Sequence, residues 1–265
     1  MIRGRASSLR RALVLLEVLG SDDVVAAGGS AVGQLAAATG REKSQVSRML
    51  ATLAEAGFAD RDPGTRRYRL GWQLFALAAR SGNQRLLVAA APVLTRLTRE
   101  TGESAHLSVL CGDGVLTLLT QSPPRALQAV SWVGRLIPAS TTSSGRALLL
   151  DHDREQLAAV FGAAPLPRPT TKAPANLDGL LDRILVARAR GYAWAEEESE
   201  PGLAAYAAPV RDGGGRIVAA LNVSGPMFRL GRSADTGELV VAAAIDLSER
   251  LRRPAAATEL AEALA

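Results

Sequence analysis

The residues best suited to chemistry in this sequence form a short polar set with helical spacing. Ser44, Ser47, Arg48 and Thr52 recur on one face of a predicted helix, and apolar residues such as Val46 fall on the opposite face. Arginine can donate two hydrogen bonds to a guanine edge, and glutamine and serine can bond other bases or phosphates. Such a helix can read a DNA major groove, although the same pattern also fits a solvated helix face. The predicted DNA contacts of this segment are Arg41, Lys43, Ser44, Gln45, Ser47, Arg48 and Thr52.

A second cationic set surrounds a predicted turn at Asp62-Pro63-Gly64, between short strands expected at 58–61 and 66–70. Guanidinium groups on such a hairpin can bind phosphates or enter a minor groove. Strand alternation directs some of them away from any duplex, and a solvated cationic loop is the alternative. The predicted contacts here are Arg61, Thr65, Arg66 and Arg67.

In the second half of the chain, hydroxyl and amide groups occur at the start of a predicted helix and along a predicted strand. Ser143, Ser144 and Gly145 open the helix, whose free N–H groups favour a carboxylate, although the serines can equally serve as N-caps. Asn222 and Ser224 lie two residues apart and therefore face the same side of their strand. These groups are able to form hydrogen bonds with a carboxylate or with another polar ligand atom.

The sequence contains no catalytic or metal-binding set. Its one cysteine is Cys111, expected to be half-buried in a strand, and its two histidines, His106 and His152, are interpreted as structural. It contains no G-x-S-x-G elbow and no Gly-rich phosphate loop after a strand. The acidic residues at 196–200 fit a solvated turn better than a metal site, because no histidine accompanies them. We therefore expect no catalytic residue, no metal and no cofactor.

Elements that can position the two basic sets are predicted around them. Helices are expected at 9–19, 32–39 and 42–56, and the hairpin follows directly. Three helices and a two-stranded wing make a winged helix-turn-helix, which favours DNA contact over a solvated face. The expected buried face of the first helix consists of Leu9, Ala12, Leu13, Leu16 and Leu19.

Beyond the hairpin, a helix that begins near Trp72 is interrupted at 81–83, which predicts a linker and a domain boundary near residue 82. The remainder mixes hairpin and helix signals. A hairpin is expected across Gly112-Asp113-Gly114 and a further strand near 126–132. This mixture indicates an α+β domain in which helices flank an antiparallel sheet.

Charge divides the chain at the same point. Residues 1–80 hold 12 Lys and Arg against 7 Asp and Glu, whereas residues 81–265 hold 19 of each, so the net charge of +5 lies in the first third. This indicates a basic module for a polyanion joined to a neutral module. The sequence has no run of about 20 apolar residues and no secretion signal, which predicts a soluble, cytoplasmic protein without a membrane partner.

Two groups of motifs resemble the IclR family of bacterial transcriptional regulators. SLRRALVLLEVL and VGQLAAATGREKSQVSRMLATLAEAGFADRDPGTRRYRLG are similar to its DNA-binding domain. TGESAHLSVLCGDGV, VGRLIPASTTSSGRALL, RGYAWAEEESEPGLAAYAAPV and ALNVSGP are similar to its effector-binding domain. The resemblance implies a winged helix-turn-helix domain at 1–70, a linker helix at 71–83, a GAF-like effector-binding domain at 84–253 and a tail at 254–265. It also implies a homodimer or homotetramer that binds a palindromic operator in double-stranded DNA and controls a metabolic or catabolic operon.

The resemblance further implies where a small-molecule effector binds. Ala195 and Ala205 stand where many members have an acidic residue and a cysteine. The pocket is therefore predicted to be roomier and less polar, and to prefer an aromatic or longer-chain organic acid over a very small one. Alternatives are an architectural DNA binder without a ligand and, more remotely, an enzyme that uses the second domain. The implied effector contacts are Ala126, Ala129, Ile137, Ser143, Ser144, Gly145, Ala195, Leu203, Ala205, Asn222 and Ser224.

Overall fold

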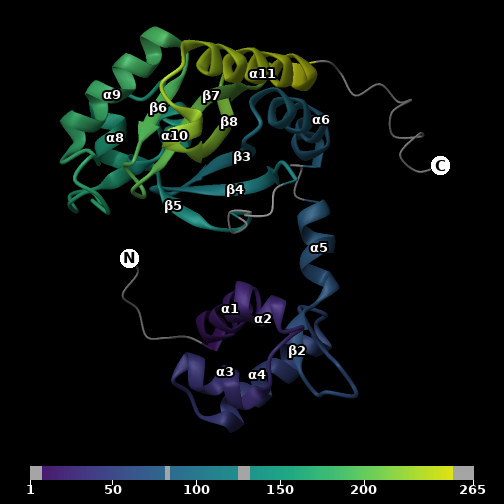
Figure 1. Ribbon diagram of the computed structural model, residues 1–265. Helices are drawn as coiled ribbons and strands as arrows, with labels where there is room; N and C mark the ends of the chain where they lie inside the picture. Colours follow the sequence, from purple (N-terminus) through teal and green to yellow (C-terminus); the bar gives the residue numbers. More distant parts are fainter. Residues whose placement is uncertain (1–7, 81–83, 125–131, 253–265) are drawn as a thin grey trace. The chain divides into compact units, whose positions relative to one another are not determined.

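A computed structural model describes residues 8–80, 84–124 and 132–252 of the chain (Figure 1). The chain divides into two compact units, and the boundary in the sequence lies between Gln84 and Arg85. Each unit has its own buried apolar core.

The first unit is a small helical domain with a two-stranded sheet. The predicted helices at 32–39 and 42–56 are confirmed as α3 and α4, and the predicted hairpin is confirmed as β1 and β2. The short helix α2 was not expected from the sequence. The elements are α1 (Ser8–Leu19), α2 (Asp22–Ala26), α3 (Val32–Thr39), α4 (Lys43–Glu55), β1 (Ala59–Arg61), β2 (Tyr68–Leu70) and α5 (Trp72–Ala79).

The core of this unit corrects the predicted orientation of α1. Leu15 and Leu19 are buried against Leu35 of α3 and the inner face of α4, whereas Leu9 and Leu13 are exposed. Apolar residues occupy most of the circumference of α1, so periodicity alone does not define which side is buried. The position of α3 and α4 selects the side that carries Leu15.

The second unit is built on one antiparallel sheet with helices on both faces. The predicted hairpin across 112–114 is confirmed as β3 and β4. The elements are α6 (Gln84–Thr101), β3 (Ser104–Cys111), β4 (Gly114–Gln121), β5 (Leu136–Pro138), a 3-10 turn (Ala139–Thr141), α7 (Ser143–Leu148), α8 (Arg154–Phe161), α9 (Leu177–Arg190), β6 (Ala193–Glu196), β7 (Leu203–Arg211), β8 (Ile217–Pro226), α10 (Met227–Leu230) and α11 (Ala234–Arg252).

The six strands lie in the order β5-β4-β3-β8-β7-β6. Helices α6 and α11 cover one face of the sheet, and α7, α8 and α9 lie on the other, so the unit has two apolar cores (Figure 1). Because side chains alternate along a strand, Leu107 of β3 enters the first core while His106 and Ser108 project from the opposite face. This alternation places polar groups on the side of α7.

The short strands β5 and β6 were not predicted, because three or four residues carry too little alternation to identify a strand. Most of the strand expected near 126–132 lies outside the described residues. The prediction for Cys111 was wrong: it is exposed, because it ends β3 beside the hairpin turn.

Candidate functional sites

Helix α4 presents a row of exposed polar side chains. Val46 and Leu50 are fully buried in the core of the first unit, which fixes the rotation of the helix. The opposite face is exposed, as the sequence predicts. Its side chains have no hydrogen-bond or ion-pair partner among the described residues, so they are free to meet a ligand. They are Lys43, Ser44, Gln45, Ser47 and Arg48.

Two other predicted contacts of this segment are differently placed. The Thr52 hydroxyl donates to the carbonyl oxygen of Arg48 at 3.2 Å, within the helix. The Arg41 side chain is half-buried, and its Nε has no hydrogen-bond partner among the described residues. Thr52 is therefore exposed on α4 with its hydroxyl already engaged, and Arg41 precedes the helix.

The turn of the wing is held by one carboxylate. Asp62 Oδ1 accepts hydrogen bonds from the backbone N–H of Thr65 at 2.6 Å, from the Thr65 hydroxyl at 2.8 Å and from the N–H of Gly64 at 3.1 Å. These bonds, with that of the Thr65 N–H the strongest, lower the pKa of the Asp62 carboxyl. Thr65 therefore serves the turn, and its hydroxyl is already engaged.

The arginines of the wing have different environments. Arg67 Nη1 donates to the carbonyl oxygen of Ala27 at 2.8 Å and so ties β2 to the loop after α2. The Arg61 guanidinium lies over the Tyr68 ring, 5.6 Å from its centroid. The Arg66 side chain is exposed and has no partner among the described residues, while its backbone N–H donates to the Asp62 carbonyl oxygen and its positive φ of 57° belongs to the turn. Of the predicted wing contacts, Arg66 is the one left free for phosphate.

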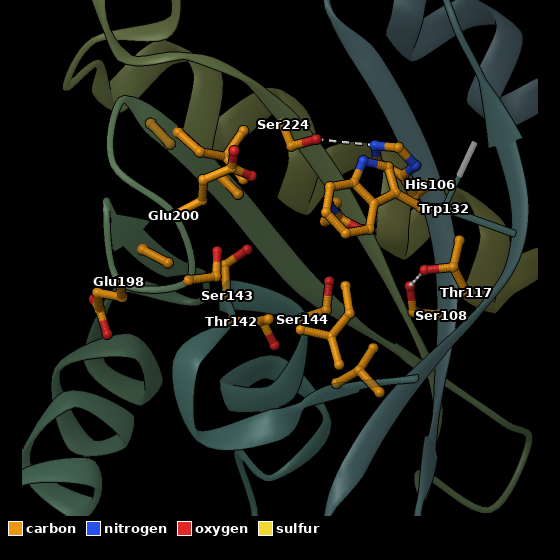
Figure 2. A pocket seen from close by; sticks show the side chains of 18 residues that line it. His106, Ser108, Thr117, Trp132, Thr142, Ser143, Ser144, Glu198, Glu200 and Ser224 are labelled. Atoms are coloured by element: carbon orange, nitrogen blue, oxygen red, sulfur yellow. Dashed lines mark hydrogen bonds between the residues drawn. The ribbon is translucent and has the colours of Figure 1, made fainter. Parts of the chain in front are cut away.

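The second unit contains a cavity of about 190 Å³ between the sheet and the start of α7 (Figure 2). Its walls come from β3, β4, β7 and β8, together with the segment after β6. The residues that line it are His106, Ser108, Val115, Thr117, Trp132, Ile137, Thr142, Ser143, Ser144, Ala195, Glu198, Ser199, Glu200, Leu203, Ala204, Ala205, Asn222 and Ser224.

The start of α7 forms one side of this cavity. Thr142 is the N-cap and accepts a hydrogen bond from the Gly145 N–H at 3.0 Å, so neither neighbouring serine is the cap. Ser143 is buried and its hydroxyl has no partner among the described residues. A Cβ at Gly145 would lie 1.9 Å from the Ala139 carbonyl oxygen, so only glycine fits there. A close turn of the backbone thus brings an unsatisfied hydroxyl to the cavity wall.

The sheet forms the opposite side, where three side chains make a hydrogen-bonded chain. His106 Nδ1 lies 2.9 Å from Thr120 Oγ1, and His106 Nε2 lies 2.9 Å from Ser224 Oγ. Strand pairing sets this arrangement, because β3 lies between β4 and β8. Burial lowers the pKa of His106 to about 4, so the ring is neutral at neutral pH. The interpretation of His106 as only structural missed its place on the cavity wall.

Glu198 lines the cavity, but its carboxylate forms ion pairs outside it. Its carboxylate is directed away from the cavity (Figure 2), where it pairs with Arg146 of α7 and Arg183 of α9. Arg146 is 2% exposed and also donates to the Trp194 carbonyl oxygen. The prediction of a solvated acidic turn was therefore wrong for Glu198, because the fold of β6 and α7 buries it.

Most predicted effector contacts meet at this cavity. Gly145 does not line it and instead shapes the turn, while Ala126 and Ala129 lie outside the described residues. Sequence reasoning missed the polar residues of β3 and β4, for which the only available signal was strand alternation in HLSVL and GVLTLLT. The predicted residues that line the cavity are Ile137, Ser143, Ser144, Ala195, Leu203, Ala205, Asn222 and Ser224.

Two wider expectations concern metals and membranes. Within residues 8–80, 84–124 and 132–252 we find no group of three or more His, Cys, Asp or Glu side chains arranged to hold a metal ion. None of the helices in these ranges is long and apolar enough to cross a membrane.

Comparison with known families matches both units. Residues 8–63 match the IclR helix-turn-helix domain, and residues 79–249 match the domain described as bacterial transcriptional regulator IclR C-terminal. Together these two matches cover most of the chain.

Individual proteins show the same similarity. The chain is 32% identical over 251 residues to the HTH-type transcriptional regulator BhcR of Paracoccus denitrificans, covering 92% of this chain and 87% of that protein. It is 32% identical over 204 residues to the Pca regulon regulatory protein of Pseudomonas putida, covering 76% and 69%. A solved IclR homolog from Microbacterium hydrocarbonoxydans, in complex with 4-hydroxybenzoate, is 26% identical with a TM-score of 0.78, covering 92% and 99%.

Proposed function

The chain belongs to the IclR family of bacterial transcriptional regulators, and from this premise we propose that it is a sequence-specific, ligand-responsive regulator of a metabolic or catabolic operon. Like these relatives, it is a regulator and not an enzyme. The observation that carries the proposal is the exposed, unpartnered polar row on α4, in a unit separate from a cavity with buried polar walls.

For DNA, we assign base reading to α4 and phosphate binding to the wing. Arg48 is the last member of the exposed row, and a bidentate contact with guanine is available to it when the helix lies in the major groove. Arg66 is the free wing cation, and it suits a phosphate or the minor groove. Arg67, which the sequence also proposes as a contact, is assigned mainly to holding the wing in place.

Footprinting and salt titration on the upstream region of the gene test these roles. Arg48→Ala should weaken discrimination among sites by about 1–3 kcal/mol. Arg66→Ala should weaken binding to all sequences and lower the slope of log K against log salt by about 1. Arg216→Ala, which removes an exposed cation from the second unit, is the matched control and should leave both quantities unchanged. Equal effects of the Arg48 and Arg66 variants would contradict the assignment.

The alternative of an architectural DNA binder makes a different prediction in the same assay. Such a protein binds with little sequence preference, and its occupancy does not respond to a metabolite. A protected palindrome whose occupancy changes with a small molecule supports the regulator. Uniform, salt-sensitive coverage would favour the architectural alternative.

For the effector, we propose an organic acid with one aromatic ring or a chain of similar bulk. A cavity of about 190 Å³ is somewhat larger than the roughly 150 Å³ that accommodates benzene in an engineered protein core. Ala195 and Ala205 have small side chains and leave room in the cavity. The buried Ser143 hydroxyl is available as a donor to a carboxylate. The similar regulator solved with 4-hydroxybenzoate supports an acid of this size.

Calorimetry with aromatic and very small acids tests the size argument. Ala205→Leu should fill the cavity and weaken binding of an aromatic acid, whereas Ala78→Leu on α5, outside the cavity, should have no effect. Binding of only a two- or three-carbon oxoacid by the wild-type protein would contradict the proposal.

We further propose that residues 1–70 bind DNA, residues 71–83 link the domains and residues 84–253 bind the effector, in a homodimer or homotetramer on a palindromic operator. Trp72 and Phe75 of α5 are 76% and 67% exposed, which is unusual for aromatic side chains and suits contact with a second copy. Light scattering with Phe75→Glu tests this: the variant should shift towards monomer. A wild-type protein that is monomeric at micromolar concentration would contradict it.

A further inference from the structure

The cavity carries information about its ligand beyond size. The described residues that line it include no Lys or Arg, so these residues offer no full positive charge to an acid. Of its two acidic residues, Glu198 turns its carboxylate to Arg146 and Arg183, whereas Glu200 has no hydrogen-bond or ion-pair partner for its side chain among the described residues. Because Glu200 is exposed, water screens its charge, and the described wall of the cavity is close to neutral.

A neutral donor set can hold one carboxylate but not two. The start of α7 supplies the Ser143 and Ser144 hydroxyls for a single carboxylate. A second carboxylate on the same ligand would meet the sheet side, where His106 is neutral and the described residues supply no cation. Burying an unpaired carboxylate there is strongly unfavourable. The cavity therefore discriminates against dicarboxylates.

The sheet side is instead suited to an uncharged polar group. Figure 2 shows Ser224 and His106 facing Thr142, Ser143 and Ser144 across the cavity. A hydroxyl on the ligand can donate to Ser224 Oγ, whose own hydrogen then goes to His106 Nε2, while Nδ1–H donates to Thr120 Oγ1. Both imidazole nitrogens and the Ser224 hydroxyl are then bonded, whereas an apolar group would leave Ser224 Oγ without a partner in the cavity.

We infer that the effector is a monocarboxylate carrying an uncharged hydroxyl at its far end, and that His106 reads this hydroxyl through Ser224. Thr120 is the positioning residue, because its hydroxyl holds the orientation of the imidazole without lining the cavity. This inference rests on the proposed function of the second unit as an effector-binding domain.

The wild-type test uses four matched probes: 4-hydroxybenzoate, 4-methylbenzoate, benzoate and terephthalate. By calorimetry, 4-hydroxybenzoate should bind about 10-fold more tightly than 4-methylbenzoate, which has the same shape without the hydroxyl. Terephthalate should bind most weakly. Equal affinities for the hydroxyl and methyl probes, or tight binding of terephthalate, would overturn the inference while leaving an acid effector in place. If none of the four binds, the proposed aromatic acid effector fails, and this inference fails with it.

Two variants then test the hydrogen-bonded chain. Thr120→Val keeps the shape of a side chain outside the cavity and should reduce the preference for 4-hydroxybenzoate over 4-methylbenzoate to less than about 3-fold, with little change in affinity for the methyl probe. His106→Phe should abolish the preference. Thr95→Val, the same change on α6 where the hydroxyl bonds its own helix, is the control and should keep the full preference. A Thr120→Val protein that retained the wild-type preference would show that the chain does not read the ligand.

Discussion

The two candidate sites of this protein are built in opposite ways. On α4 the candidate side chains are exposed and have no hydrogen-bond or ion-pair partners among the described residues, whereas around the cavity most polar side chains are buried and several are bonded to one another. Exposed groups can be altered without changing the folded state, because water replaces what is removed. Buried polar groups support fold and function together, because a lost partner leaves a desolvated atom. Substitutions on α4 are therefore expected to alter binding alone, whereas substitutions around the cavity are expected to alter both binding and stability.

The largest effect should come from the turn at the start of α7. Gly145→Ala forces a Cβ to 1.9 Å from the Ala139 carbonyl oxygen and should lower the free energy of unfolding of the second unit by at least about 4 kcal/mol. Gly33→Ala in α3 meets no atom within 4 Å and should be neutral or slightly stabilising, because alanine favours a helix. Urea unfolding measures the free energy of unfolding of both variants. Similar losses for Gly145→Ala and Gly33→Ala would contradict the tight packing proposed for the turn before α7.

Next in size is the buried ion pair behind the cavity. Glu198→Leu leaves the Arg146 charge buried with only the Trp194 carbonyl, and it should lower the free energy of unfolding by about 3–5 kcal/mol. Arg146→Met should lower it less, because Glu198 keeps Arg183. The exposed pair of Arg154 and Asp178 is the control, and Asp178→Asn should leave unfolding almost unchanged. Equal losses for the two buried variants would contradict this account of the pair.

A pH dependence of intermediate size should distinguish the cavity from the DNA-binding unit. The folded pKa of His106 is about 4, below the ordinary value of 6.5, so the unfolded chain takes up this proton first as pH falls. Stability should therefore be lost between about pH 6.5 and pH 4, by about 2 kcal/mol at pH 5. Urea unfolding at pH 7.5 and 5.0 should show this loss in the wild type and a smaller one in His106→Gln. Identical pH dependence in the two proteins would contradict a neutral buried ring.

The smallest effect concerns the wing, where one arginine, Arg67, supports the fold although it lies within the exposed candidate site. Arg67→Ala removes the bond to the Ala27 carbonyl and should lower the stability of the first unit by about 1 kcal/mol. Arg66→Ala should leave stability unchanged while weakening DNA binding, because Arg66 has no partner among the described residues. Thermal unfolding of both variants separates the roles. Equal stability of the two variants would mean that the wing has no inward-facing arginine.

Sequence patterns predicted the helices and the polar row of α4 well, because both depend on residues within a few positions of each other. They predicted the buried face of α1 poorly, since its apolar residues extend around the helix and only packing against α3 chooses a side. In the cavity, the resemblance identified residues near α7, β7 and β8 that do line it. It supplied nothing for His106, whose role depends on the strands on either side of β3.

By itself the sequence determined the basic first unit, the polar face of α4, the mixed α and β character of the second unit and the family to which the chain is similar. The tertiary structure decided which polar groups meet. His106 and Ser224 are 118 positions apart, Arg146 and Glu198 are 52 apart, and Arg67 and Ala27 are 40 apart. The physical reason is range: helical periodicity acts over a few residues, whereas these bonds depend on strand pairing and on the packing of helices against the sheet.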